Sequence, residues 1–275
     1  MMMGKQLRLR RFNPSGRSVI IAIDHGATAG IVPGLERPAE IAKLADQAGA
    51  DGILVTPGIL EQVMDSVGSL AILLRIDGCV SIQGAGPMRL FCSVEHATGL
   101  GVDGVIVNAV IGSPYENEEL QKLGEVAAAG RHFGVPVIAE MLSWKMLDNH
   151  LDFSGSAKTD LPPDMDEEVA LACRIGVEMG ADAVKTRYSG STQRFREVVH
   201  ATGCPVLVAG GPNRQHALPE TLSLVDEALE AGASGVVFGR RIWQHSDPAE
   251  ALRAVCAMVH EDATVAEALD LSPVS

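Results

Sequence analysis

The stretch Ser18-Val19-Ile20-Ile21-Ala22-Ile23-Asp24 is an almost unbroken apolar run of strand length. Apolar runs without alternation are typical of strands buried on both faces, as in parallel sheets. The run follows a strong turn signal, Asn13-Pro14-Ser15-Gly16, and ends at Asp24 and His25. A buried strand with polar groups at its C-terminal end is therefore predicted here.

Seven more apolar runs of this kind follow, each leading into a helical pattern. The strands are predicted at 52–56, 70–77, 104–110, 136–141, 182–186, 205–209 and 235–238. The helices are predicted at 37–48, from 59, and at 93–100, 116–133, 166–179, 192–201, 219–231 and from 248. Eight successive strand–helix units in 275 residues predict the α/β class and a TIM (β/α)8 barrel. A doubly wound sheet is the alternative, but the glycine-rich loop after residue 24 lacks the GxGxxG pattern.

Domain organisation follows from the even composition of the chain. No linker-like shift is present, so a single domain is predicted over 1–275, with a basic N-terminal lead-in (1–17) and a C-terminal helical tail (about 262–275). The segment 142–164 is polar, contains Pro162-Pro163, and is long for a loop inside a compact domain. Loops of this length are usually lids, binding loops or disordered segments.

The composition limits the classes of partner. The net charge of -13 argues against nucleic acid but leaves room for a small anionic substrate in a local basic pocket. Five cysteines without a CxxC pair favour reduced thiols and a cytoplasmic protein. The absence of an 18-residue apolar run predicts no membrane partner, and the absence of HxH or HExxH patterns predicts no metal.

Lys185 is the most unusual residue of the predicted strands. A buried ammonium group needs either an ion-pair partner or a role as a neutral nucleophile. Side chains alternate along a strand, so Lys185 shares a face with Ala183 and Arg187. If the small Ala183 faces the barrel interior, Lys185 points toward the mouth, and Arg187 is a candidate cationic neighbour that favours the neutral amine.

Other polar residues end the predicted strands, where catalytic groups of such barrels lie. Asp24 is predicted to be an acid–base group that also holds Lys185. His25 alternates to the other face, so it is assigned to substrate binding rather than catalysis, through a loop that returns it to the site. For Glu140, structural pairing and acid–base chemistry are both open. Hydrogen-bonding or loop-fixing roles are expected for two further residues, Asp77 and Asn108.

Two glycine-containing segments follow the seventh and eighth strands, Gly210-Gly211 and Gly239-Arg240. In TIM barrels these two loops frequently bind a phosphate through backbone N–H groups, and Arg240 could add a charge. Either segment alone could be an ordinary turn. Their occurrence together, after the appropriate strands, favours a phosphate site.

The chain resembles the class I, Schiff-base aldolases of the DeoC/FbaB type. The resemblance rests on segments that occur in the family's order: Ile23-Asp24-His25-Gly26, Pro33-Gly34-Leu35-Glu36, Val184-Lys185-Thr186, Val208-Ala209-Gly210-Gly211 and Gly235-Val236-Val237-Phe238-Gly239-Arg240. It implies Lys185 as the Schiff-base lysine, Asp24 as its acid–base partner, and backbone phosphate binding at Gly210, Gly211, Gly239 and Arg240. It also implies a ring-shaped homo-oligomer, such as a decamer.

Some segments are most similar to the branch that contains the thiolase of phosphorylated autoinducer-2. They include Arg11-Phe12-Asn13-Pro14, Ile111-Gly112-Ser113-Pro114-Tyr115-Glu116 and residues 259–266. The family's aldolases and heptulosonate synthases carry a catalytic tyrosine where this chain has Leu142, and the thiolase branch also lacks it. Tyr188 or Glu140 are the candidates to replace its proton chemistry.

The expected function is therefore that of a carbon–carbon lyase or transferase in carbohydrate metabolism. It would act on a phosphorylated ketose or ketone through an imine on Lys185, without a cofactor. The alternatives within the family are a thiolase that uses coenzyme A as co-substrate and a heptulosonate-type synthase. Outside it are an isomerase or synthase in which Lys185 is only an electrostatic clamp, and, ranked lower, a sugar-phosphate sensor without catalysis, suggested by Leu142.

Overall fold

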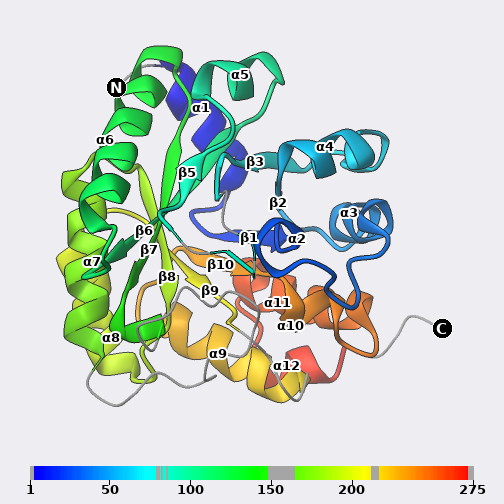
Figure 1. Ribbon diagram of the computed structural model, residues 1–275. Helices are drawn as coiled ribbons and strands as arrows, with labels where there is room; N and C mark the ends of the chain where they lie inside the picture. Colours follow the sequence, from blue (N-terminus) through cyan, green and yellow to red (C-terminus); the bar gives the residue numbers. More distant parts are fainter. Residues whose placement is uncertain are drawn as a thin grey trace.

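Eight parallel strands close into a barrel in the order β1-β10-β9-β8-β7-β6-β3-β2, which confirms the predicted TIM barrel (Figure 1). The computed structural model describes residues 3–147 except 79–80, 82 and 85, and then 165–211 and 217–271. The barrel strands are β1 (Ser18–Ala22), β2 (Gly52–Val55), β3 (Ala71–Arg75), β6 (Gly104–Ile111), β7 (Val137–Ser143), β8 (Ala183–Arg187), β9 (Val206–Ala209) and β10 (Gly235–Phe238).

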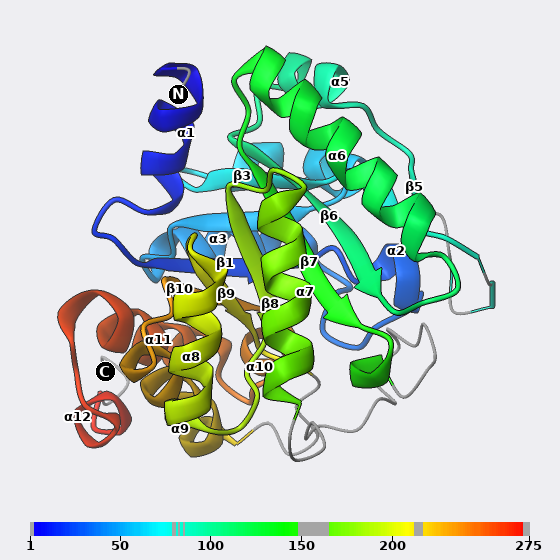
Figure 2. The same ribbon diagram turned by 90° about the vertical axis from the view of Figure 1, so that its left-hand side faces the viewer.

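Helices surround the strands in both views (Figures 1 and 2). The longer helices are α1 (Met3–Phe12), α3 (Pro38–Gln47), α4 (Pro57–Val63), α5 (Val94–Gly99), α6 (Glu116–Phe133), α7 (Asp166–Glu178), α8 (Thr192–Thr202), α9 (Leu218–Glu230), α11 (Pro248–Glu261) and α12 (Val265–Leu269). Within the described part of the chain, none of the helices is long and apolar enough to cross a bilayer.

Several short elements were not predicted as separate elements from the sequence pattern. They are α2 (Gly26–Ala29), η1 (Met64–Ser66), the antiparallel pair β4 (Asp77–Gly78) and β5 (Arg89–Leu90), η2 (Lys145–Leu147) and α10 (Arg240–Trp243). β7 also continues to Ser143, so the predicted loop 142–164 begins as strand and 3-10 helix. The remainder of that loop, 148–164, lies outside the described residues.

Every second side chain along each strand points into the barrel and fills its interior. Ile20 and Ala22 of β1 lie in the same inner cluster as Leu73 of β3, Ile138 of β7 and Ala183 of β8. The alternate strand residues face the helices and form a separate, larger cluster. Because Ala183 faces inward, Lys185 two residues later does as well, as predicted from alternation.

The N-terminal end of the barrel is organised by carboxylates that immediately precede three strands. Asp51, Asp103 and Asp182 each accept a backbone N–H from the neighbouring strand, at 2.6, 2.8 and 2.8 Å. Two of these carboxylates also bind cations of α1: Asp103 pairs with Arg11 at 2.7 Å, and Asp182 pairs with Lys5 at 2.8 Å. The predicted basic lead-in is thus a helix docked on an acidic end.

Phe12 closes this end of the barrel. Its side chain is 3% exposed and belongs to the inner cluster. Glycines begin β2 and β6 beneath it, and a Cβ there would lie 3.2 Å (Gly52) or 3.0 Å (Gly104) from the ring. The ring therefore occupies space that is free only because both of these strand residues lack a side chain.

Replacing Phe12 by alanine is expected to lower the free energy of unfolding by about 3–5 kcal/mol, because a buried ring is lost and the glycine-lined space cannot collapse. Urea denaturation measures the change. Leu7→Ala on the same helix is the matched control, since Leu7 is 56% exposed, and should change stability by less than about 0.5 kcal/mol. Equal effects of the two substitutions would contradict this account of Phe12.

Candidate active site

A pocket opens at the C-terminal ends of the strands, where the inward-facing positions change from apolar to polar. Continuing the interior alternation by one step from Ala22, Leu73, Ile106, Ile138 and Ala183 reaches five polar residues that line the pocket: Asp24, Arg75, Asn108, Glu140 and Lys185. The same step on β10 reaches Gly239. The site is therefore the next interior layer of the barrel.

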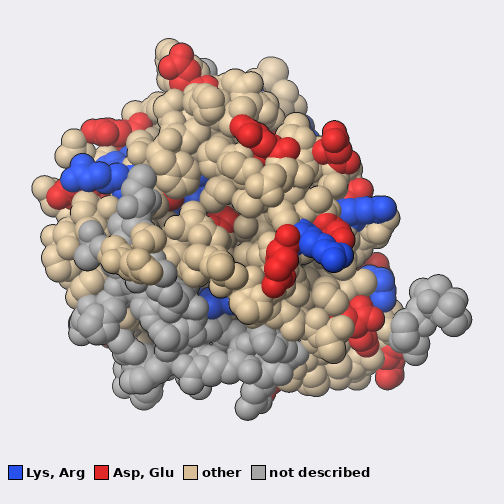
Figure 3. Space-filling model, turned by 45° about the vertical axis from the view of Figure 1, so that its right-hand side comes forward, with Lys and Arg blue, Asp and Glu red and all other residues tan. Residues whose placement is uncertain are grey.

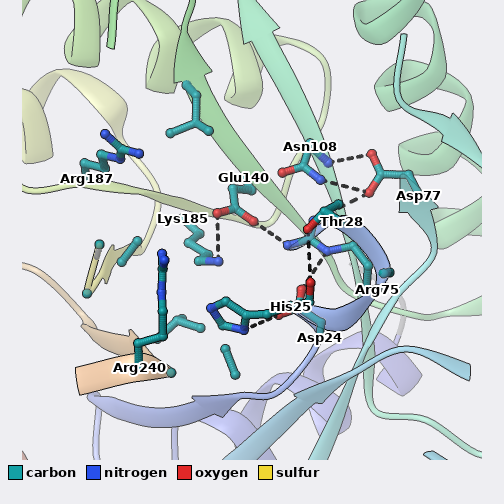
Figure 4. Close-up of a pocket in the computed structure, with 18 of the residues that line it drawn as sticks. Asp24, His25, Thr28, Arg75, Asp77, Asn108, Glu140, Lys185, Arg187 and Arg240 are labelled. Carbon is teal, nitrogen blue, oxygen red and sulfur yellow. Dashed lines mark hydrogen bonds and ion pairs between the residues drawn. The ribbon is translucent and has the colours of Figure 1, made fainter. Parts of the chain in front are cut away.

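Lys185 forms an ion pair at the centre of this layer (Figure 4). Its Nζ lies 2.7 Å from Oε1 of Glu140, and both side chains are nearly buried, at 9% and 13% exposure. The two residues are direct partners in the parallel ladder between β7 and β8. Burial opposes ionisation of Glu140, but Lys185 and Arg75 outweigh it and lower the pKa of this carboxyl to about 2.

Arg75 is the main site residue that sequence reasoning missed. It ends β3, is buried, and pairs with Glu140 through Nη2 and with Asp24 through Nε at 2.9 Å. Burial disfavours its charge, but the carboxylates of Glu140 and Asp24 raise the pKa of the guanidinium above its usual range. The signal that identified Lys185, a charged residue in an apolar strand, was also present at Arg75.

Asp24 lies in the site as predicted, but with a different partner. The expected carboxylate for Lys185 was Asp24, whereas the structure pairs Lys185 with Glu140 and Asp24 with Arg75. The reason is geometric, because Glu140 is the ladder partner of Lys185 while Asp24 lies beyond the end of β1. Burial would raise the pKa of Asp24, but Arg75 lowers it below its ordinary value, so Asp24 is a carboxylate.

His25 reaches the pocket although strand alternation placed it on the other face. It caps α2 with helical backbone angles (φ −64°, ψ −30°), so the alternation ends before it. Its Nδ1 lies 3.6 Å from Oδ1 of Asp24, and its ring stands edge-on to Trp243. Burial, reinforced by the positive charges of Arg240 and Lys185, lowers the pKa of His25 to about 4. The imidazole is therefore neutral at physiological pH.

The glycine segments after β9 and β10 line the side of the pocket that faces the ends of β3 and β6. Gly210, Gly211, Gly239 and Arg240 are all lining residues, so the structure brings the predicted phosphate-binding residues together. A Cβ on Gly239 would lie 2.5 Å from the His25 ring, and one on Gly210 would lie 2.9 Å from Phe238. Arg241, not predicted, donates to the carbonyl of Gly210 and so ties the two segments together.

Two of three further candidate residues, Arg187 and Leu142, line the pocket, and Tyr188 does not. The Nη1 of Arg187 donates to the carbonyl of Met146 at 3.3 Å. Arg187 was the predicted cationic neighbour of Lys185, but the cation that binds the same carboxylate as Lys185 is Arg75. Leu142 is 3% exposed and lines the pocket two residues beyond Glu140. Tyr188 is not among the lining residues; it contacts Thr192, and burial raises its pKa to about 12. Tyr188 is therefore poorly placed to replace the family tyrosine.

Asp77 and Asn108 have the hydrogen-bonding role that was predicted for them. The carboxylate of Asp77 accepts the backbone N–H of Asn108 at 2.8 Å and pairs with Lys122 of α6 at 2.6 Å.

No group of three His, Cys, Asp or Glu side chains suited to a metal occurs among the residues that the structure describes. On the face shown in Figure 3, blue and red atoms lie inside a central hollow, while other Lys and Arg side chains stand among acidic ones.

Comparison with known proteins identifies the class. The family model described as DeoC/LacD family aldolase matches residues 18–245. The chain is 34% identical to 2-amino-3,7-dideoxy-D-threo-hept-6-ulosonate synthase of Halobacterium salinarum, covering 97% of this chain and 95% of the relative. It is also 34% identical to 3-hydroxy-5-phosphonooxypentane-2,4-dione thiolase of Escherichia coli K12, covering 98% and 86%.

A solved structure agrees with these sequence relatives. An archaeal fructose-1,6-bisphosphate aldolase with its catalytic lysine covalently bound to the carbinolamine intermediate of the substrate matches with a TM-score of 0.80 and 30% identity, over 93% of this chain and 99% of that one. The chain belongs to the DeoC/LacD aldolase family. It is an enzyme of the class I, Schiff-base aldolase type, as the resemblance implied.

The lowered pKa of His25 predicts a specific pH dependence of stability. Between about pH 4 and 6.5 the unfolded chain binds a proton at this histidine and the folded chain does not, so the free energy of unfolding falls as the pH falls through this window. In His25→Asn this part of the acid sensitivity should disappear, as measured by urea denaturation at a series of pH values. His96→Asn, at an exposed position, is the control, and identical pH slopes for wild type and His25→Asn would refute the assignment.

Proposed function

We propose that the enzyme breaks or forms a carbon–carbon bond next to the carbonyl of a phosphorylated ketose or ketone, through an imine on Lys185. The observation that carries this proposal is the buried lysine at the barrel mouth, whose Nζ lies 2.7 Å from a carboxylate that Arg75 also binds. A lysine amine is the protein nucleophile that forms imines with ketones.

The ion pair suits the charge changes of imine formation. The ammonium must first give up a proton so that the amine can attack the carbonyl carbon, and the carbinolamine hydroxyl then takes up a proton and leaves as water. Overall, two ammonium protons leave with the carbonyl oxygen. The protonated imine again carries a positive charge on the same nitrogen, so Glu140 faces a cation both before and after the condensation. A carboxylate already in place for that cation stabilises it without rearrangement.

Asp24 is proposed as the acid–base group of the bond-breaking step. Its carboxylate lines the same pocket and is ionised at rest. As the carbon–carbon bond breaks, the electron pair moves into the iminium to give an enamine, and Asp24 accepts the proton of the hydroxyl that becomes a carbonyl. Glu140, paired with two cations, is the weaker base of the two.

The phosphate is proposed to bind at Gly210, Gly211, Gly239 and Arg240, with His25 and Arg187 as further contacts to the substrate. These residues line the same pocket as Lys185, and the backbone N–H groups of such loops are suited to binding an anion. Arg240 supplies the charge. A neutral His25 can donate one hydrogen bond and accept another.

Coenzyme A as acyl acceptor is the second candidate function, and Leu142 favours it. An apolar side chain occupies the pocket wall beside Glu140, where it cannot donate a proton to an aldehyde acceptor. Acyl transfer to a thiol does not need that donor. The near-equal identities to a synthase and a thiolase do not choose between these acceptors.

We also propose, from the family resemblance, that the protein is cytoplasmic and forms a ring-shaped homo-oligomer, such as a decamer. Sedimentation tests the oligomeric state.

Incubation with dihydroxyacetone phosphate and borohydride is expected to leave a reduced adduct on Lys185, located by mass spectrometry of peptides. Lys185→Met should trap no adduct and lose at least about a thousandfold in kcat on a panel of phosphorylated ketones tested with aldehyde acceptors and with coenzyme A. Turnover without an adduct would favour the electrostatic-clamp alternative. Tight binding without turnover would favour a sensor.

Arg240→Gln is expected to raise KM for a phosphorylated substrate about tenfold or more and to change kcat by less than about threefold, because a charge-assisted contact contributes about 1.5–3 kcal/mol. Steady-state kinetics measures the split. Arg37→Gln, which removes an exposed arginine paired with Glu40, is the control. An unchanged KM in Arg240→Gln would remove this residue from the phosphate site.

A further inference from the structure

Arg75 occupies an unusual position, because one guanidinium faces three carboxylates from different parts of the barrel. Nε lies 2.9 Å from Oδ2 of Asp24, Nη1 lies 3.5 Å from Oδ1 of Asp77, and Nη2 contacts Oε2 of Glu140. The Arg75 side chain is only 8% exposed. The rigid, planar arginine head can hold three partners in fixed directions, whereas a lysine ammonium is a compact charge on a flexible stem.

The two oxygens of Glu140 have separate partners. Oε2 contacts Arg75, and Oε1 lies 2.7 Å from Nζ of Lys185. The contact with Arg75 therefore fixes the rotation of the carboxylate about its own axis, and this rotation sets where Oε1 lies. Figure 4 shows Glu140 between the two cations.

We propose that Arg75 is a positioning residue for the imine chemistry: by binding one oxygen of Glu140, it aims the other at the nitrogen that becomes the iminium. This inference rests on the proposed function of Lys185. Arg75 does not form the covalent bond. Its effect reaches the reaction through the carboxylate that faces the developing cation.

The second effect of Arg75 is on the proton affinity of Glu140. The charged or titratable groups around this carboxylate are Lys185 on β8, Arg75 on β3, and Asp24 and His25 after β1. Without Arg75, Glu140 keeps one cation and the nearby carboxylate of Asp24, so it takes up a proton at higher pH. The acid limb of the reaction should then move to higher pH.

The test uses the rate of adduct formation at Lys185 with dihydroxyacetone phosphate and cyanoborohydride, measured over a range of ketone concentrations and acidic pH values. Arg75→Met should lower the maximal trapping rate about a hundredfold, the scale expected for misplacement of a reacting group, and should change the half-saturating concentration by less than about threefold. Its acid limb should move to higher pH. Arg75→Lys should restore the acid limb but only part of the rate.

Lys5→Gln is the matched control for general loss of stability. It breaks another buried ion pair, with Asp182, at the opposite end of the barrel. It should lower Tm and leave trapping unchanged. Should Arg75→Met fail to fold, Arg75→Lys makes the test alone, with an expected loss in rate of at least about tenfold.

The outcomes separate this inference from the proposed function. Arg75 variants that trap at the wild-type rate overturn the positioning role, and a higher half-saturating concentration at an unchanged maximal rate would instead make Arg75 a substrate-binding residue. A wild-type enzyme that forms no adduct at Lys185 overturns the proposed function itself.

Discussion

The buried positive charge of Lys185 on β8, beneath the barrel mouth, needs a counter-charge within a few ångströms. The parallel ladder supplies it, because Glu140 on β7 is the direct partner of Lys185. A buried carboxylate shared with one lysine is still poorly solvated, and Arg75 provides its second cation. Arg75 in turn contacts Asp77, which Lys122 of α6 binds from the outside. The polar layer is thus a chain of alternating charges that begins at the lysine and ends on a helix.

This arrangement divides the barrel into zones with different tasks. The middle is apolar and holds the strands together, and the N-terminal end is held by Asp51, Asp103 and Asp182. The C-terminal end carries the charges that would be costly anywhere else in the core. The glycines after β9 and β10 line the remaining side of the pocket, where Gly210 and Gly239 allow Phe238 and His25 to pack closely. Function can therefore be altered at one end with limited effect on the stability of the other.

Much of the fold could be predicted from sequence, because each barrel strand is a short apolar run with a turn or helix signal after it. Lys185 was singled out as a charged residue in an apolar strand, and Asp24 and the paired glycine segments by their place at strand ends; the structure places all of them around one pocket. Short elements such as α2 and β4–β5 were not predicted, because so few residues show no clear period of apolar and polar positions. The helical backbone at His25 ended an alternation that the sequence pattern extended by one residue too many. The pairing of Lys185 with Glu140 rather than Asp24 depends on strand register, which no local pattern encodes.

The docking of α1 has a consequence for the order of folding. This helix precedes every barrel strand in the sequence, yet its Lys5 binds Asp182, 177 residues later in the chain. Arg8 donates to the carbonyl of Gly134, and Phe12 rests on the first residues of β2 and β6. A contact of such sequence separation forms only after the intervening strands have assembled, since closing so long a loop costs entropy that no local contact returns. We therefore expect α1 to dock late in folding, onto the N-terminal end of a barrel whose strands have already paired.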